Sequence, residues 1–383
     1  MKKFTAAVVG TGFIGPVHVE GLRRAGVNVS GILGSSPEKS TASAESLDLP
    51  TGYASLDDLL RDRDVDVVHI TSPNRFHFDQ VCQVIAAGKH VLCEKPLAMN
   101  ATQSRELVRL ATTAGVAAAV NYNIRYYPLC IEAASRVRSG TVGDLFHVTG
   151  SYSQDWLFHP TDFNWRVVAD DGGELRAVAD IGTHWLDLVQ HVTSRKVSAV
   201  CADLSTVYPQ RHRPVGGAQT YSGHRNESRD SESIDVTTED YGCVMLRFDD
   251  GSRGVMWVSQ VTAGRKNCLR FELAGSAESL SWNSESPNEL WVGHRDKPNE
   301  TLIRDPGLID PLAAAFTSYP GGHNEGFGDT FKQLFRDFYG SIEDGGFRTK
   351  PSYPTFHDGH HEILVCEAIL ESHRTQRWVS VAL

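Results

Sequence analysis

The sequence predicts an α/β domain built on a parallel sheet, followed by an α+β domain with a large, mostly antiparallel sheet. Up to about Asn123, short apolar segments alternate with helical ones, which is typical of βαβ units. After Asn123, longer segments with period-two alternation predict antiparallel strands. A glycine-rich turn, Gly10–Gly15 (GTGFIG), directly follows the first apolar segment.

The first domain is predicted to span residues 1–123. Its strands are expected at Thr5–Gly10, Val27–Leu33, Val65–Ile70, His90–Cys93 and Val116–Val120. Its helices are expected at Pro16–Ala25, Leu56–Arg61, Phe78–Ala87 and Ala101–Ala114. The crossovers between these parallel strands should be right-handed.

The second domain is predicted to span residues 124–383. Its strands are expected at Phe146–Ser153, Lys196–Thr206, Gly242–Phe248, Gly254–Val261, Cys268–Ala274 and Trp378–Val381. Its helices are expected at Cys130–Ser139, Thr183–His191, Phe327–Tyr339 and His360–Ser372. Hairpin turns are expected at Asp249–Gly251 and Gly275–Ser276, and a loop at Gln210–Glu232, which is rich in Gly, Ser, Arg, Asp and Asn.

The composition limits the functional class. The chain has 383 residues, 40% hydrophobic and 22% charged, which suits a globular protein of two domains. A net charge of −10 argues against general nucleic-acid binding, which needs a basic face. No run of about 20 apolar residues predicts a membrane span. Gly10 and Gly12 interrupt the apolar N-terminal segment, so it is interpreted as a strand instead of a signal peptide, and a cytoplasmic location is expected.

Cysteine and histidine patterns favour neither disulfides nor metals. The seven cysteines are odd in number and form no C-x-x-C pair, so they are expected to be reduced. The densest histidine cluster, His357, His360 and His361, lacks a convincing carboxylate partner set. No metal site is therefore predicted.

The glycine turn carries the first functional signal. Gly10, Gly12 and Gly15 form G-x-G-x-x-G between a predicted strand and a predicted helix, the context that a dinucleotide-binding Rossmann domain requires. Gly10 permits the tight turn, Gly12 lets the backbone approach a pyrophosphate, and Gly15 allows close packing of helix and strand. The helix N-terminus beyond Phe13 and Ile14 then offers N–H groups to phosphates.

The residues after the second strand should select NAD or NADP. The stretch from Gly34 to Lys39 (GSSPEK) places neither an acid at the position that binds both ribose hydroxyls nor an arginine for a 2′-phosphate. Ser35 and Ser36 suit a ribose hydroxyl or a phosphate, and Lys39 suits a phosphate. The choice stays open, with NAD slightly favoured.

Three further motifs, taken with the glycine turn, carry a family resemblance. Thr71-Ser72-Pro73-Asn74 with His77 follows the third predicted strand, Glu94-Lys95-Pro96 follows the fourth, and Asp180-Ile181-Gly182-Thr183-His184 lies in the second domain. Arg125 and the pair Trp165-Arg166 fit the same pattern. Together these stretches closely resemble the glucose–fructose oxidoreductase, inositol dehydrogenase and rhizopine-catabolism family of sugar dehydrogenases, over almost the whole chain.

The resemblance implies a Rossmann domain followed by a domain with an open antiparallel sheet, whose face commonly mediates oligomers such as dimers or tetramers. It assigns catalytic positions to Lys95, Asp180 and His184. It assigns cofactor-lining positions to Gly10, Gly12, Phe13, Ile14, Gly15, Ser35, Ser36, Thr71, Pro73, Asn74, His77, Glu94, Lys95 and Asn123. The peptide bond before Pro96 is expected to be cis, aiming Lys95 into the cleft.

The residue chemistry is consistent with these roles. His184 suits the general base that takes the alcohol proton, and Asp180, four residues earlier, would share its helix face. Lys95 would stabilise the negative charge on the reacting oxygen. Further substrate-binding candidates are Tyr122, Gln154, Trp165 and His323, from their polar or aromatic chemistry and their positions at segment ends.

The sequence departs from the family pattern at two places. The acid that ends the second strand in many NAD-using relatives is absent. Between Gly173 and Asp180 the chain carries Glu-Leu-Arg-Ala-Val-Ala, which is longer than the commonest spacing, so the pocket wall there is expected to differ.

The predicted function is therefore an NAD(P)-dependent oxidoreductase that moves a hydride between the nicotinamide and a carbinol carbon of a sugar, anhydrosugar or inositol. One alternative is an NAD-dependent glycosidase that oxidises C3 transiently, eliminates the aglycone and re-reduces. A second alternative is a non-catalytic sugar or dinucleotide sensor.

Overall fold

The computed structural model describes residues 4–215 and 230–382, which form two compact units. The first unit comprises Met1–Asn123 and Phe327–Ile363, and the second comprises Ile124–Gly326 and Leu364–Leu383. The predicted division at residue 123 coincides with a junction between the units. Residues 327–363, however, group with the first unit instead of with the rest of the predicted 124–383 segment.

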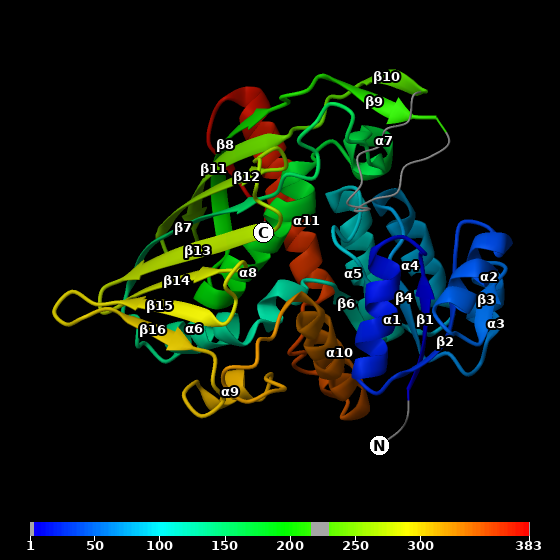
Figure 1. Ribbon diagram of the computed structural model, residues 1–383, viewed down its shortest axis with the longest axis horizontal. Coiled ribbons are helices and arrows are strands. Elements are labelled where there is room, and N and C mark those ends of the chain that lie inside the picture. Colours follow the sequence, from blue (N-terminus) through cyan, green and yellow to red (C-terminus); the bar gives the residue numbers. More distant parts are fainter. Residues whose placement is uncertain (1–3, 216–229, 383) are drawn as a thin grey trace. The chain divides into compact units, whose positions relative to one another are not determined.

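The first unit contains a parallel sheet of six described strands in the order β3-β2-β1-β4-β5-β6, which is the Rossmann order (Figure 1). This confirms the predicted fold class of the N-terminal domain. The strands and helices up to residue 120 are β1 (Thr5–Val9), α1 (Ile14–Arg24), β2 (Asn28–Leu33), α2 (Pro37–Ser46), β3 (Thr51–Tyr53), α3 (Leu56–Arg61), β4 (Val67–Ile70), α4 (His77–Ala86), β5 (His90–Cys93), α5 (Ala101–Ala114) and β6 (Ala118–Val120).

Two elements of this unit escape the sequence prediction. Helix α2 (PEKSTASAES) is composed of small and polar residues, and β3 has only three residues, so neither produces a clear apolar period. The segment predicted as the third strand is therefore the fourth, β4, and the strand predicted as the fourth is β5. Sequence periodicity is weak evidence for such short elements.

Helix α10 (Phe327–Glu343) completes the first unit. It packs beside α1 (Figure 1), and its Phe331 and Phe335 rings lie 5.5 and 5.2 Å from the ring of His18 on α1. The unit also includes a 3₁₀ turn at Gly346–Arg348 and the first part of α11 (Phe356–Thr375). The Rossmann core therefore depends on a segment about 200 residues distant in the sequence.

The second unit is built on nine described strands in the order β16-β15-β14-β13-β7-β12-β11-β8-β17. Neighbours are antiparallel except β7 and β12, which run parallel. This confirms the predicted large, mostly antiparallel sheet. Its strands are β7 (Leu145–Ser153), β8 (Val197–Ser205), β11 (Tyr241–Phe248), β12 (Arg253–Ser259), β13 (Cys268–Gly275), β14 (Ser279–Asn283), β15 (Glu289–Gly293), β16 (Glu300–Ile303) and β17 (Val379–Ser380).

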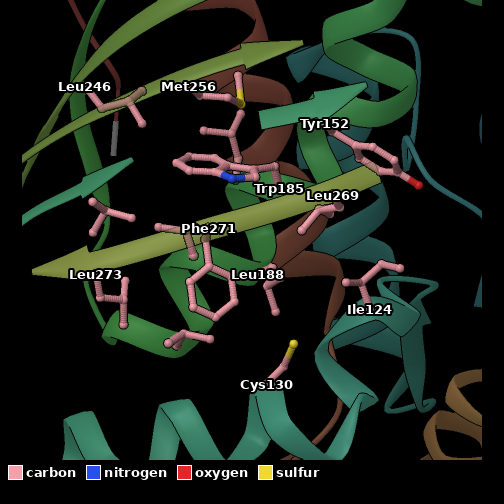
Figure 2. Packing of buried hydrophobic residues seen from close by; sticks show 14 of the residues in the cluster. Ile124, Cys130, Tyr152, Trp185, Leu188, Leu246, Met256, Leu269, Phe271 and Leu273 are labelled. Carbon is pink, nitrogen blue, oxygen red and sulfur yellow. The ribbon is translucent and has the colours of Figure 1, made fainter. Parts of the chain in front are cut away.

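Helices cover one face of this sheet and form its core. They are α6 (Pro128–Arg138), α8 (Thr183–Thr193), α9 (Pro311–Ala314) and the end of α11. The short helix α7 (Ala169–Gly172) contributes no residue to this core. Figure 2 shows the Trp185 indole of α8 among Met256, Leu269 and Phe271 of the sheet. Trp185 is fully buried, and its indole N–H donates a 2.9 Å hydrogen bond to the carbonyl of Arg270.

The segment predicted as the Gln210–Glu232 loop is partly a β-ribbon. Its ends form β9 (Gln210–Pro214) and β10 (Ser231–Asp235), which pair antiparallel, and residues 216–229 lie outside the described residues. The polar composition conceals this ribbon because Arg211 is buried through ion pairing instead of through apolar contact. In the described part of the chain, no helix has the length and apolarity needed to cross a membrane.

Substituting Trp185→Ala should destabilise the second unit by about 3–5 kcal/mol, because a large buried side chain and its hydrogen bond are both lost. Denaturant unfolding of the full chain, followed by circular dichroism, measures this. Phe146→Ala, at a strand position that is 58% exposed, is the matched control and should change stability little. Equal effects of the two substitutions would contradict the central packing role of Trp185.

Candidate functional site

In the first unit, the segments that follow successive strands converge at the carboxyl edge of the sheet. The first residues after β1, β4, β5 and β6 each donate a backbone hydrogen bond of 2.7–2.8 Å to the end of a neighbouring strand, and these donors are Gly10, Thr71, Glu94 and Asn121. Ligands of open parallel sheets bind outside this edge. The loops predicted to hold the cofactor therefore share one edge of the sheet.

The glycine turn shows why two of its positions exclude side chains. Gly10 has φ +123°, and a Cβ there would lie 2.4 Å from Oγ1 of Thr71. A Cβ on Gly15 would lie 2.1 Å from the carbonyl oxygen of Gly10. Both glycines are needed for the turn to close against its neighbours. Around the Cβ position of Gly12, in contrast, there is open space, which suits close approach of a ligand to the backbone.

The N-terminus of α1 follows this turn. Helix α1 begins at Ile14, and Phe13 directly before it is exposed. No side chain caps the helix, the Gly15 N–H donates to the carbonyl of Gly12 at 3.1 Å, and Pro16 has no N–H. The remaining N–H groups of the turn suit an anionic ligand such as a pyrophosphate.

After β2, the two candidate serines have different environments. Ser36 is the N-cap of α2, and its Oγ accepts the backbone N–H of Lys39 at 3.3 Å. Ser35 is exposed, and its Oγ accepts a 3.1 Å hydrogen bond from Nζ of Lys39. A hydrogen bond from Ser36 lowers the pKa of Glu38, so an exposed anionic carboxylate stands beside these serines.

The loops after β4 and β5 are joined by His77. This side chain is fully buried, and its ring nitrogens lie 2.8 Å from the carbonyl oxygen of Pro96 and 2.9 Å from that of Ser72. Thr71 and Asn74 are also buried, and Pro73 is partly exposed. His77 thus links the Thr71–Asn74 loop to the loop that carries Lys95. The Lys95–Pro96 peptide bond is cis, as expected.

Lys95 follows a buried carboxylate. Its backbone N–H donates to Oε2 of Glu94 at 3.1 Å, and its side chain is partly buried. Burial acts to raise the pKa of Glu94, but hydrogen bonds from His18 and Asn121 and the charges of His18 and Lys95 together lower it to about 2. Glu94 is therefore ionised beside the candidate catalytic lysine.

Tyr122 and Asn123, at the end of the first unit, are buried. Nδ2 of Asn123 donates a 2.7 Å hydrogen bond to Oγ1 of Thr330 on α10. Asn123 thus anchors α10 to the end of the Rossmann sheet. Its role as a cofactor-lining residue stays a prediction, as does that of Tyr122 in substrate binding.

In the second unit, Asp180 is held by two donors. Nε of Arg166 lies 3.1 Å from Oδ1 of Asp180, and Nε2 of Gln260 lies 2.8 Å from Oδ2. Asp180 lies in a π-helical turn, Val178–Gly182, that leads directly into α8, whose second residue is His184. Such π turns are frequent at functional sites. The partly exposed His184 ring lies 6.3 Å from the ring of Tyr152.

The ends of β7 and β12 lie side by side because these strands are parallel. Ser153 pairs with Ser259, so Gln154 and Gln260 follow at the same edge. The Gln154 side chain donates to Oδ1 of Asn267 at 2.7 Å and accepts from the indole of Trp156 at 2.8 Å. Gln154 therefore supports its neighbours, whereas Gln260 contacts Asp180.

Two substrate-binding candidates lie elsewhere in the second unit. Trp165 is partly buried, and the Arg166 guanidinium lies 4.3 Å from the centre of its ring, so the tryptophan supports the arginine that binds Asp180. His323 is exposed in the segment before residue 326, with Nδ1 3.4 Å from the carbonyl oxygen of Gly321. Arg125, noted in the sequence, forms a buried ion pair with Asp187 of α8, with Nε 2.8 Å from Oδ2.

The longer segment before Asp180 is fixed by a buried ionic network. Asp240 accepts hydrogen bonds from both Arg176 and Arg211, and all three side chains are inaccessible to solvent. Glu239 accepts the backbone N–H groups of Arg176 and Val178 at 2.8–3.0 Å. Burial raises the pKa of Glu239 to about 6. The network attaches the π turn to the β9 ribbon. Its contribution to a pocket wall stays a prediction.

Two family models match the chain. The first, described as an oxidoreductase family with an NAD-binding Rossmann fold, matches residues 4–122. The second, the GFO/IDH/MocA C-terminal domain, matches residues 131–281. The chain belongs to the GFO/IDH/MocA family of oxidoreductases. The resemblance inferred from the motifs is confirmed, and so are the enzyme class and NAD as the cofactor.

Several relatives in this family match most or all of the chain. A levoglucosan dehydrogenase from Pseudarthrobacter phenanthrenivorans is 28% identical over 100% of this chain and 99% of its own length. An uncharacterized oxidoreductase from Synechocystis is 30% identical over 76% of this chain and 74% of its own length. A solved levoglucosan dehydrogenase in complex with NADH and L-sorbose has a TM-score of 0.89, with 27% identity and complete coverage of both chains.

Sequence reasoning missed several residues that organise the site. Gln260 binds Asp180, Glu239 and Asp240 hold the segment before it, and His18 binds Glu94. Arg166 was noted in the family pattern, but its contact with Asp180 was not predicted. One signal was available: both β7 and β12 end in Ser-Gln, which suggests equivalent positions.

Within the described residues, no group of three or more histidine, cysteine or acidic side chains suits a metal ion. In the histidine cluster noted in the sequence, Nδ1 of His360 lies 2.8 Å from Oγ of Ser104.

The contrast between Gly12 and Gly15 yields a matched test of the cofactor site. Gly12→Ala should leave the melting temperature unchanged, because its Cβ meets nothing, yet weaken NADH binding at least about tenfold by obstructing the pyrophosphate. Gly15→Ala should lower the melting temperature, because its Cβ meets a backbone carbonyl. Thermal unfolding and NADH fluorescence titration measure both. Unchanged NADH affinity in Gly12→Ala would contradict the assignment.

Proposed function

We propose that the protein transfers a hydride between NAD and a secondary alcohol or ketone carbon of a sugar, anhydrosugar or inositol. The observation that carries the proposal is the held carboxylate of Asp180, bound by Arg166 and Gln260, in the turn that leads into His184. A general base needs a fixed neighbour of this kind, because proton transfer depends on its orientation. The NAD-binding domain of the same chain supports the redox assignment.

The proposed chemistry divides the work between three side chains. In the oxidation direction, His184 takes the proton of the reacting hydroxyl, and the carbon–hydrogen bond pair leaves as hydride to NAD. Asp180 stabilises the imidazolium that forms. Lys95 donates a hydrogen bond to the reacting oxygen and stabilises its negative charge in the transition state. The reduction direction reverses each transfer.

An anhydrosugar is the substrate class we favour. The relatives that cover the whole chain include a levoglucosan dehydrogenase, and solved structures titled levoglucosan dehydrogenase contain levoglucosan or L-sorbose with NADH. Trp165, whose ring contacts the arginine that binds Asp180, supplies aromatic surface that suits the apolar face of a sugar ring. Inositols and other cyclic polyols remain in the proposed class.

The test is a spectrophotometric assay of purified enzyme with NAD or NADP and a panel of anhydrosugars, sugars and inositols. Levoglucosan or a close analogue should produce NADH stoichiometrically. His184→Asn should lower kcat by about 10²–10⁴-fold while leaving NADH affinity unchanged, because only the general base is lost. His357→Asn, at an exposed histidine without a proposed role in the site, is the matched control and should change kcat much less.

The outcomes separate the candidate functions. NADH formation that survives His184→Asn would contradict the role of His184. Cleavage of a glycoside without net NADH would favour the NAD-dependent glycosidase. Tight NADH and sugar binding without any turnover would favour the sensor.

We also propose that the protein forms a homo-oligomer through the outer face of the nine-stranded sheet. Side chains alternate across a pleated sheet, so the residues that do not enter the core lie on this face. It exposes Tyr241, Met245, Val255 and Trp291, each 36–45% accessible. An apolar surface of this kind, spread over several strands, is typical of an interaction site.

Replacing two of these residues tests the oligomer. Met245→Lys with Val255→Lys, which face each other across β11 and β12, should convert the oligomer to monomers because charge would be desolvated in the interface. Size-exclusion chromatography with light scattering measures the mass. Lys substitution of Leu308, an exposed residue outside the sheet, is the control. A wild-type monomer at micromolar concentration would contradict the proposal.

A further inference from the structure

A chain of buried hydrogen bonds leads away from Glu94 through the first unit. Nε2 of His18 lies 3.1 Å from Oε1 of Glu94, and Nδ1 of His18 lies 2.9 Å from Nδ1 of His69. Nε2 of His69 lies 3.0 Å from the hydroxyl of Tyr339. All four side chains are buried, and both histidines are completely inaccessible. None of the three outer residues has a role in the chemistry proposed above.

The four side chains come from different elements. His18 lies in α1, just after the glycine turn, His69 on β4, Glu94 at the end of β5, and Tyr339 on α10. The rings of Phe331 and Phe335 pack against His18 and exclude water from the chain. The hydrogen bond to Tyr339 and the shielding of His18 therefore both depend on α10, which lies more than 200 residues after Glu94 in the sequence.

The carboxylate determines the direction of the first hydrogen bond. Ionised Glu94 can only accept, so Nε2 of His18 must donate to it. Burial, and then the charge of His18, hold the pKa of His69 well below its ordinary value, so His69 is neutral. Burial, and then the charge of Asp66, raise the pKa of Tyr339 well above its ordinary value, so Tyr339 keeps its proton. The outer members thus add no charge of their own.

Glu94 has few other charged neighbours. Titratable or polar groups from several elements surround this chain of hydrogen bonds. They are His18 from α1, His69 from β4, Tyr339 from α10 with Asp66 beyond it, Cys93 and Lys95 on either side of Glu94, and Asn121 after β6. Burial raises the pKa of the Cys93 thiol well above its ordinary value, so it is neutral. Besides His18, the cation that acts on Glu94 is therefore Lys95 itself.

We propose that His18 is a positioning residue for Lys95. It holds Glu94 as an oriented carboxylate, and Oε2 of Glu94 in turn fixes the backbone N–H of Lys95. His18 and Asn121 bind Oε1 of Glu94, and Oε2 accepts the backbone N–H of Lys95. This inference rests on the proposed function in one respect, the catalytic role of Lys95.

Removal of the His18 side chain should change the pH dependence of enzyme activity. Without its hydrogen bond and charge, burial dominates, and the pKa of Glu94 rises from about 2 toward or above its ordinary value. As the pH falls through that raised pKa, Glu94 becomes protonated and no longer accepts the N–H of Lys95. The enzyme should then lose activity on the acid side, in a range where the unsubstituted enzyme does not.

The experiment compares His18→Leu with His18→Gln in the full-length enzyme, measuring kcat with NAD and the best polyol from pH 5 to 9. His18→Leu should lose more kcat between pH 7 and 5 than the unsubstituted enzyme does. His18→Gln retains an N–H donor close to the position of Nε2 and should restore most of the unsubstituted profile. The double variant His18→Leu with Glu94→Gln should lack the new acid limb, because no carboxyl titrates.

A second measurement does not depend on turnover. A group whose folded pKa lies above its unfolded value stabilises the fold at low pH and loses that contribution as the pH rises. The melting temperature of His18→Leu should therefore fall below that of the unsubstituted protein more at pH 8 than at pH 5. If His18→Leu does not fold, ¹³C NMR of Glu94 in the unsubstituted protein serves instead and should show no titration between pH 5 and 8.

The results that overturn the inference are distinct from those that overturn the proposed function. Three results would overturn the inference. The first is a folded, active His18→Leu enzyme whose kcat has an unchanged pH profile. The second is an acid-side loss of kcat that persists in the double variant, and the third is titration of Glu94 above pH 5 in the unsubstituted protein. Absence of turnover in the unsubstituted enzyme, with the pH-dependent melting difference intact, would instead overturn the proposed function.

Discussion

Parallel strands end at the same edge of a sheet, and the placement of the functional residues in both units depends on this constraint. In the first unit, the segments after β1, β4, β5 and β6 are joined by backbone hydrogen bonds, so the glycine turn and Lys95 follow from strand direction. In the second unit most neighbours are antiparallel, but β7 and β12 are parallel. Their common end brings Gln154 and Gln260 together. The two sheets differ in architecture, yet each positions polar groups by the same geometric rule.

Buried carboxylates then hold these groups in place. A buried charge is tolerated only when hydrogen bonds and opposite charges replace the lost water. Asp240 satisfies this condition through two arginines, Glu239 through backbone N–H groups, and Glu94 through His18 and Asn121. Glu94 directly precedes Lys95, and Glu239 holds the turn that contains Asp180 through the N–H of Val178. Two of these buried carboxylates thus fix the backbone beside residues with proposed catalytic roles.

The sequence predicted those features that local chemistry determines. The glycine turn, the strand-end motifs and the D-x-G-x-H segment were recognisable because backbone geometry and spacing limit the residues allowed there. The roles of Gln260 and His18 could not be recognised in the sequence, because they depend on which strand or helix lies beside each residue. The short strand β3 lacks an apolar period, and no local pattern indicates that residues 327–363 group with the N-terminal unit. What the sequence left open is determined by contacts between distant segments.

The return of residues 327–363 to the first unit has a consequence during synthesis on the ribosome. The first 123 residues leave the ribosome long before α10 exists, so the nascent Rossmann sheet lacks the helix that covers α1. Phe331 and Phe335 are not yet present to shield the buried histidines from water. The first unit therefore reaches its final core only after nearly the whole chain has emerged. The domain that begins the sequence is one of the last parts to be completed.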